Sequence, residues 1–185
     1  MKEDRQNPSD GALVRQWRNG DEEAFNMLYD RYRLPLYSYL NRLVTGQPAL
    51  VDELYQQTWI RVLDKLPNYR DRSAFVSWLF RIAHNLAVDH FRRTARLKPV
   101  TDEQRLPEQA PDPQRKVERE QLYDEVERCV RELPPEQAEV VMLRQNGLSF
   151  KEIARIQECS LNTALGRMHY AVRRLRKMML PEEVS

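Results

Sequence analysis

The sequence is poor in glycine and cysteine and has no long apolar run. Only 5 of its 185 residues are glycine, and its apolar residues recur at helical rather than alternating spacing, so an all-α fold is predicted. The two cysteines, Cys129 and Cys159, form no C-x-x-C pair, which argues against a disulfide framework and fits a reducing cytoplasm. No apolar run approaches the roughly 20 residues needed to span a bilayer, and the polar start, MKEDRQNPSDG, is unlike a secretory signal. A soluble, cytoplasmic protein is therefore expected.

Motifs of common enzymes are missing as well. The sequence contains no phosphate loop, no H-E-x-x-H motif and no cluster of Cys and His. His84 and His90 are too badly spaced to share a helix face, and the adjacent Asp52 and Glu53 point to different sides. We therefore predict that the protein is not an enzyme and has no metal site and no cofactor.

An excess of one charge is missing overall, but cations gather locally. Lys and Arg number 30 against 28 Asp and Glu, so the net charge is only +2 and does not by itself indicate a nucleic-acid partner. The segments 74–98 and 166–178 are different, because each carries five Lys or Arg residues and at most one acid. These two segments are the candidates for nucleic-acid binding.

Residues 10–98 form a first predicted helical domain. Asp21 precedes a helical pattern that ends at Leu43, and Pro35 inside it predicts a kink or a break. A second helix carries Val51, Tyr55, Thr58, Val62 and Leu66 on one face, with Asp52 and Glu53 in its first turn. Pro67 ends that helix. The third helix carries seven apolar residues at helical spacing: Phe75, Trp78, Leu79, Ile82, Leu86, Val88 and Phe91.

The third helix also presents polar and basic side chains, interleaved with aromatic residues. Basic charge next to aromatic faces is the combination that holds single-stranded or opened nucleic acid. Phe75, Trp78 and Leu79 are better interpreted as core, since aromatic residues at helical spacing usually pack inside. The outward residues are the candidate contacts: Arg81, Asn85, His90, Arg92 and Arg93.

A linker and a second helical domain complete the chain. Residues 99–113 are rich in proline and contain no aromatic residue, which predicts a flexible tether. Residues 114–180 again show helical spacing; Pro134-Pro135 is expected to break one helix and start the next, and Gly147 to end it. The predicted architecture is two small helical domains joined by the tether.

The segment 148–178 has the pattern of a helix-turn-helix. Ser149 and Glu152 form a capping box, so a helix should begin at Phe150. The break 158–160 has the length of a helix-turn-helix turn, although it lacks glycine, and Ser160 can cap the next helix. The inward side of that helix is expected to be Leu161, Ala164, Leu165, Met168, Val172 and Leu175. Its exposed Asn, Thr and Arg side chains could enter a major groove, but an ordinary helical hairpin with a solvated basic end remains the alternative.

Two stretches together resemble the bacterial sigma factors of the extracytoplasmic-function (ECF) type, in the sigma-70 family. DELYQQTWIRVLDKL (52–66) is similar to that family's region 2.2, and FVSWLFRIAHNLAVDHFRR (75–93) to its regions 2.3 and 2.4. LPPEQAEVVMLRQNGLSFKEIARIQECSLNTALGRMHYAVRRLRKM (133–178) is similar to its region 4. The resemblance covers residues 10–179, with the tether matching only in character.

The resemblance implies a function. Such proteins bind core RNA polymerase, melt the minus-ten promoter element with region 2 and read the minus-thirty-five element with region 4; many are held by an anti-sigma factor. The implied polymerase contacts lie on the non-core side of the second helix: Asp52, Glu53, Gln56, Gln57, Trp59 and Arg61. The implied minus-ten contacts are Tyr69, Arg70, Ser73, Arg81, Asn85, His90, Arg92 and Arg93. The implied helix-turn-helix contacts are Ser149, Lys151, Ser160, Asn162, Thr163, Arg167, His169, Tyr170 and Arg173.

The chain departs from the family pattern at Leu165 and Gly166, where a basic residue and a serine are usual, so readout at one promoter position should be weaker.

Other functions remain open. A repressor or activator could carry the same helix-turn-helix with an N-terminal sensing domain, but it would give no role to the polymerase-contact helix or to the basic aromatic helix. A helical interaction protein without nucleic acid would leave both basic segments unexplained.

Overall fold

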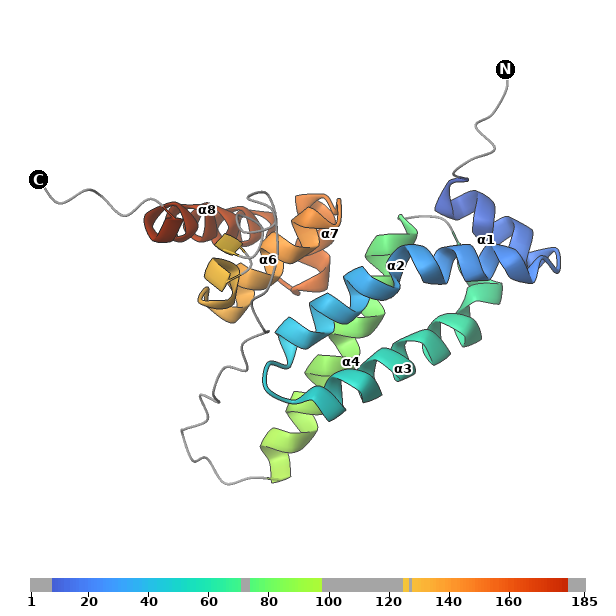
Figure 1. The fold of residues 1–185 in the computed structure, drawn as a ribbon, viewed down its shortest axis with the longest axis horizontal. Helices are drawn as coiled ribbons and strands as arrows, with labels where there is room; N and C mark the ends of the chain where they lie inside the picture. The colour runs from blue at the N-terminus through green and yellow to red at the C-terminus, as the bar shows by residue number, and fades with distance from the viewer. Residues whose placement is uncertain (1–7, 71–73, 98–124, 127, 180–185) are drawn as a thin grey trace, which may run out of the picture. The chain divides into compact units, whose positions relative to one another are not determined.

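The computed structural model describes residues 8–70, 74–97, 125–126 and 128–179. Over this part of the chain the regular structure is helical, with no strand, as the sequence predicted. The chain divides into two compact units, residues 1–101 and 102–185 (Figure 1). The predicted tether, 99–113, lies outside the described residues, as does Ser73. No helix within the described ranges is long and apolar enough to cross a membrane.

The first unit is built from α1 (Asp10–Arg18), α2 (Glu22–Leu43), α3 (Pro48–Lys65), the 3-10 turn η1 (Leu66–Asn68) and α4 (Phe75–Leu97). Helices α2, α3 and α4 pack on one another, and α1 packs on α2 (Figure 1). The core is formed by fully covered aromatic and aliphatic side chains, among them Leu28, Leu36, Tyr39, Leu40, Leu54, Val62, Phe75, Leu79, Phe80 and Leu86. Asp21, which was expected to precede this helix, caps it, because its carboxylate accepts a hydrogen bond from the Glu23 N–H at 3.1 Å.

Three details of this unit differ from expectation. Helix α2 continues through Pro35 without the break that was one of the two outcomes expected there, because burial of the apolar side chains that follow offsets the hydrogen bond lost at the proline. Helix α3 begins at Pro48, a residue suited to the first helical turn, so Asp52 and Glu53 lie beyond that turn rather than within it. Phe91 is 41% exposed, since α4 extends past the helices that cover its first half.

Helix α1 was not predicted from the sequence. The Ser9 side chain caps it by accepting from the Ala12 N–H, and the covered side chains of Leu13 and Val14 fix its inner face. At its start, the Asp10 carboxylate accepts hydrogen bonds from the Arg31 guanidinium and the Tyr32 hydroxyl. Burial and the bond to Asp10 raise the pKa of the Tyr32 phenol well above its ordinary value.

The second unit contains α6 (Pro135–Gln145), α7 (Phe150–Ile156) and α8 (Leu161–Met179), preceded by helical residues at 125–126 and 128–131. The predicted start at Pro135 is confirmed, and Gly147 follows the end of α6 with a left-handed φ of +83°. The capping box is present, since the Ser149 hydroxyl accepts from the Glu152 N–H while the Glu152 carboxylate accepts from the Ser149 N–H at 2.8 Å. Helices α7 and α8 both pack on α6.

The inner face of α8 is narrower than predicted. Ala164 and Ala171 are fully covered, but Leu161, Leu165 and Val172 are each about 40% exposed. Small alanines at the crossing let α8 approach its neighbours closely, which leaves the larger apolar side chains on a shoulder of the helix. The expectation that all three point inward was wrong.

Candidate functional site

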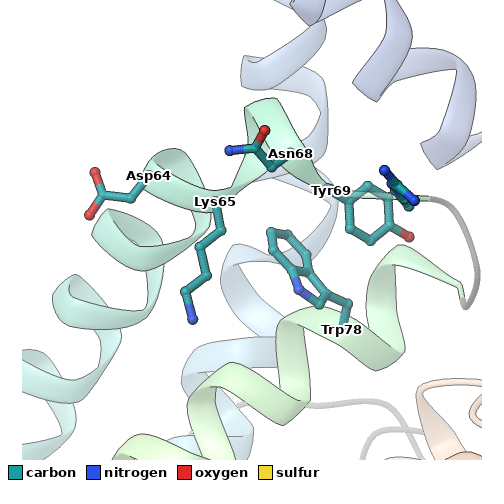
Figure 2. Close-up of a pocket in the computed structure, with 6 residues that line it drawn as sticks. Asp64, Lys65, Asn68, Tyr69 and Trp78 are labelled. Carbon is teal, nitrogen blue, oxygen red and sulfur yellow. The ribbon is translucent and has the colours of Figure 1, made fainter.

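A hollow with a volume of about 360 Å³ lies at the junction of α3, η1 and α4 (Figure 2). Its volume falls within the roughly 300–1,000 Å³ typical of small-ligand sites. The lining combines charged, amide and aromatic side chains: Asp64, Lys65, Asn68, Tyr69, Arg70 and Trp78. Figure 2 shows the Trp78 indole between the Lys65 side chain and the Tyr69 ring. A flat aromatic face beside cationic and amide groups suits the stacking of a nucleobase.

Tyr69 and Trp78 form the aromatic wall of this hollow. Their ring centroids are 4.7 Å apart, and Phe75 packs against both, at 6.0 Å from Tyr69 and 5.6 Å from Trp78. Tyr69 is only 5% exposed, so its ring supports the wall instead of offering a broad contact surface. Tyr69 can therefore offer DNA no more than a ring edge, and its contact with DNA stays a prediction. Trp78, which its spacing assigned to the core, is half-buried and lines the hollow.

A polar strip on α4 continues from the hollow. Trp78, Arg81, Asn85 and Arg92 follow one another at spacings that place them on one side of a helix, and the last three are exposed. Arg93 is exposed beside this strip, and its Nε donates to the Asp89 carbonyl at 3.3 Å. His90 lies on the opposite side of the helix from Arg92. The structure thus gathers three of the five predicted α4 residues, Arg81, Asn85 and Arg92, on this strip. Arg93 lies between the strip and His90 around the helix.

The predicted polymerase-contact residues on α3 are mostly at the surface. Asp52, Glu53, Gln56 and Arg61 are exposed, and Gln57 is half-buried. The Asp52 carboxylate accepts a hydrogen bond of 2.9 Å from the Tyr37 hydroxyl on α2, and this bond raises the pKa of Tyr37. Asp52 is therefore held in place from the neighbouring helix.

Trp59 does not belong to this surface, so that prediction was wrong. Its indole is 6% exposed and packs against Phe25 at 5.9 Å and Tyr29 at 4.9 Å, because residue 59 turns toward α2. The apolar residue that does face outward is its neighbour Ile60, which is 58% exposed and lies on the same helix side as Glu53 and Gln56. Leu63, also exposed, extends this side by one turn.

Helix α8 presents two neighbouring strips of polar side chains. Asn162, His169, Arg173 and Lys177 occupy one strip, and all four are exposed. The second strip is formed by Thr163, Arg167, Tyr170 and Arg174. The exposed shoulder of Leu161, Leu165 and Val172 borders the first strip. Cations, hydrogen-bonding side chains and apolar groups on one helix are the mixture needed to contact phosphates, base edges and thymine methyl groups.

The predicted serines have a structural role in addition to any contact with DNA. Ser149 serves the capping box of α7, and the Ser160 hydroxyl accepts from the Thr163 N–H at 3.0 Å at the start of α8. Lys151 is exposed on the first turn of α7. The turn between the helices contains Glu158 at a φ of +48°, which supplies the left-handed residue that the missing glycine would have provided.

Gln157 connects three elements of the second unit. Its amide nitrogen donates to the Glu136 carbonyl at 3.0 Å and to the Glu139 carboxylate at 2.9 Å, both on α6. Its amide oxygen accepts from the Arg167 guanidinium on α8 at 2.9 Å. Arg167, a predicted DNA contact, is thereby oriented by the turn of the helix-turn-helix motif.

Sequence reasoning missed Lys65, Asn68, Ile60 and Gln157. For Lys65 and Asn68 a signal existed, since they flank Pro67 at the end of the second helix, next to the loop that was already a candidate. Ile60 and Gln157 gave no signal in the sequence. The exposure of Ile60 depends on how α3 is rotated against its neighbours, and the role of Gln157 depends on contacts with other helices. Local spacing encodes neither. Among the described residues, no group of three or more His, Cys, Asp and Glu is placed to hold a metal ion.

Both units match families of known proteins. Residues 28–97 match the family described as Sigma-70 region 2, and residues 123–175 match Sigma-70, region 4. The chain is 32% identical over 176 residues to the ECF RNA polymerase sigma-E factor of Haemophilus influenzae, covering 88% of this chain and 91% of that protein. It is 30% identical over 174 residues to the sigma-E factor of Escherichia coli K12, covering 88% and 90%.

Solved structures share the fold. The sigma factor RpoE of Bartonella quintana, in complex with the anti-sigma factor NepR, superposes with a TM-score of 0.61 at 20% identity, covering 84% of this chain and 98% of that one. CnrH in complex with the cytosolic domain of CnrY superposes with a TM-score of 0.60 at 23% identity, covering 95% and 100%.

Proposed function

The chain belongs to the ECF sigma factors of RNA polymerase, and from that membership we propose how its two units divide the work of starting transcription. The protein is a promoter-specific transcription initiation factor whose partners are core RNA polymerase and promoter DNA. The first unit captures the melting minus-ten element, and the second reads the minus-thirty-five element as duplex. The role of the chain is binding and positioning, in the cytoplasm.

One observation carries the proposal for the first unit. The exposed strip of Arg81, Asn85 and Arg92 on α4 leads directly to Trp78 and the hollow. A strand running along this strip would meet cations for its phosphates and, at the end, an aromatic face for an unstacked base. Removing a base from the stack costs a few kcal/mol, which a stacking pocket offsets. The hollow is therefore the proposed capture site for one base of the minus-ten element.

The polymerase surface is assigned to the outer side of α3. Asp52, Glu53, Gln56 and Arg61 supply the polar part, and Ile60 replaces Trp59 as its apolar member. An exposed aliphatic side chain surrounded by polar groups is typical of the centre of a protein interface.

The minus-thirty-five element is assigned to α8, with α7 and the turn as support. The N-terminal half of the second helix in such a motif enters the major groove. Asn162, Thr163 and Arg167 lie there, while Arg173 is placed for a phosphate. Gly166 removes a side chain from the same surface, and Leu165 offers an apolar group where a cation is usual in the family.

The repressor or activator with a sensing domain is not favoured, because the sigma-E relatives match across 88% of the chain and include the first unit. The anti-sigma factors in the two solved complexes bind those proteins; for this chain such a partner stays a prediction.

Measurements on the full chain bound to core RNA polymerase test whether the first unit captures the minus-ten element and the second unit reads the minus-thirty-five element. Asn85→Ala should leave core affinity unchanged but weaken capture of a single-stranded minus-ten segment by the resulting holoenzyme. Arg173→Ala should weaken duplex minus-thirty-five binding about uniformly across sequences and reduce its salt dependence by about one charge. If both substitutions impair the same step, the proposed division between units is wrong.

A further inference from the structure

Arg18, the last residue of α1, reaches across the first unit to the wall of the hollow. Its guanidinium donates to the Leu66 carbonyl from Nε at 3.3 Å and from Nη2 at 2.9 Å, and Nη2 also donates to the Tyr69 carbonyl. These contacts join residues 48 and 51 positions apart in the chain. They connect α1 directly to the segment that lines the hollow.

The guanidinium binds where α3 gives way to η1. Leu66 follows the last residue of α3 and begins η1, and Tyr69 follows η1; the Leu66 carbonyl also accepts a hydrogen bond of 3.2 Å from the Tyr69 N–H. A cation is also favoured there by the helix dipole. Arg18 therefore fixes the backbone at Leu66 and at Tyr69, on both sides of Asn68, a residue that lines the hollow.

The wall is held from its aromatic side as well. Tyr69 packs on Trp78 and Phe75, and Phe75 packs on Tyr32 with ring centroids 5.6 Å apart. The Tyr32 hydroxyl donates to Asp10 at the start of α1. Both ends of α1 are thus connected to the same wall. Arg18 contacts it directly, and Asp10 is connected to it through Tyr32 and Phe75. Helix α1 precedes the stretch matched as region 2, residues 28–97.

We propose that Arg18 is a positioning residue that sets the shape of the hollow and so determines which base it accepts, an inference that rests on the proposed capture of a minus-ten base there. Arg18 is not a DNA contact in this scheme, because its guanidinium is engaged by the two carbonyls. A planar guanidinium can hold two separate acceptors in one fixed geometry, whereas a lysine ammonium acts as a single point charge.

The test compares Arg18→Gln and Arg18→Lys with the matched control Arg15→Gln, an exposed arginine one turn earlier on α1. Each full-length variant is assembled with core RNA polymerase. The holoenzyme then selects from a pool of fork-junction DNAs whose single-stranded minus-ten segment is randomised, and the bound DNAs are sequenced. Core affinity and duplex minus-thirty-five binding are measured on the same preparations.

Arg18→Gln should flatten the base preference at one minus-ten position by about tenfold, a typical loss when a charge-assisted hydrogen bond is removed. Core affinity and minus-thirty-five binding should stay at the wild-type level, Arg18→Lys should fall between, and Arg15→Gln should match wild type. If Arg18→Gln does not fold, Arg18→Lys, which keeps the charge, carries the test.

Two results would overturn the inference on Arg18 alone. One is a wild-type base preference in Arg18→Gln. The other is a parallel loss of core affinity and base preference, which would show that Arg18 only stabilises the fold. A wild-type protein that shows no base preference anywhere in the strand would instead overturn the proposed capture site, and the Arg18 inference with it.

Discussion

The Arg167 guanidinium on α8 donates a hydrogen bond of 2.9 Å to the Gln157 amide oxygen, while the Gln157 nitrogen is held by α6. A side chain that we propose reads a base edge is thus restrained from two helices before DNA arrives. Restraint in the free protein reduces the entropy lost on binding, which improves affinity without adding a contact.

A double-mutant cycle tests this coupling. Gln157→Ala and Arg167→Ala should each weaken binding to minus-thirty-five duplex DNA, and the double variant should be no weaker than the stronger single one. The expected coupling is about 0.5–1.5 kcal/mol, the usual net value of one such hydrogen bond. In the control pair, Gln157→Ala with Arg173→Ala, the effects should add. Additive effects in the first pair would mean that Gln157 does not act through Arg167.

Leu165 should read a thymine methyl group. Its side chain is 42% exposed beside the strip that carries Asn162 and His169, and apolar contact with thymine is a known mode of major-groove readout. Replacing the contacted thymine of the selected minus-thirty-five element by deoxyuridine removes one methyl group. Binding should weaken about fourfold, corresponding to about 0.8 kcal/mol per buried carbon.

Leu165→Ala provides the control for that measurement, because it should abolish the difference between thymine and deoxyuridine. If the variant and the wild type respond equally to deoxyuridine at every thymine, Leu165 does not contact a methyl group.

Ile60 and Trp59 should separate polymerase binding from stability. Ile60→Ala should weaken affinity for core polymerase by at least about fivefold, as expected for an apolar side chain near the centre of an interface, with thermal unfolding unchanged. Trp59→Ala should destabilise the first unit by about 3–5 kcal/mol, because it empties a buried aromatic site. Fluorescence titration of core polymerase and circular dichroism would measure the two effects. Unchanged core affinity in Ile60→Ala would remove this face from the interface.

Gly147 and Gly166 should respond to alanine with opposite signs. Gly147 has a φ of +83°, so Gly147→Ala strains the backbone although the added methyl group would meet open space, and it should destabilise the second unit by about 1 kcal/mol. Gly166 lies within α8, where an added methyl group also meets open space, so Gly166→Ala should stabilise the unit by about 0.5–1 kcal/mol.

All three tryptophans, Trp17, Trp59 and Trp78, lie in the first unit, so hydrogen exchange of α6–α8 peptides is the suitable measurement for the glycine pair. Stabilisation by Gly147→Ala would show that the turn after α6 tolerates a side chain in another conformation.

Local signals predicted the fold well where they were strong. Asp21, Pro135 and the Ser149–Glu152 pair mark helix starts that the structure has, because capping chemistry is local in sequence. The same approach missed α1, whose packing depends on contacts with α2, and misjudged Trp59 and Leu165, whose exposure depends on how each helix is rotated against its neighbours. Tertiary packing, and not spacing, decides which residues at the edge of an apolar stripe are covered.

In the candidate site, too, some features could be predicted from local spacing and others depend on tertiary packing. Spacing predicted that Arg81, Asn85 and Arg92 face outward from α4, and they do. It also grouped His90 with them, although His90 lies on the opposite side of the helix from Arg92. The hollow itself is lined by residues of α3, η1, the segment after η1 and α4, so only the assembled fold brings its parts together.

Run-off transcription would show whether the chain directs RNA polymerase to promoters. Core RNA polymerase from the source organism would be incubated with genomic promoter fragments in the presence and absence of the full chain, and transcript starts would be mapped. We predict new starts that need the chain and share a minus-ten and a minus-thirty-five element, and we predict that Asn85→Ala reduces them. Binding of the chain to DNA without association with core polymerase, and without new starts, would contradict its role as an initiation factor.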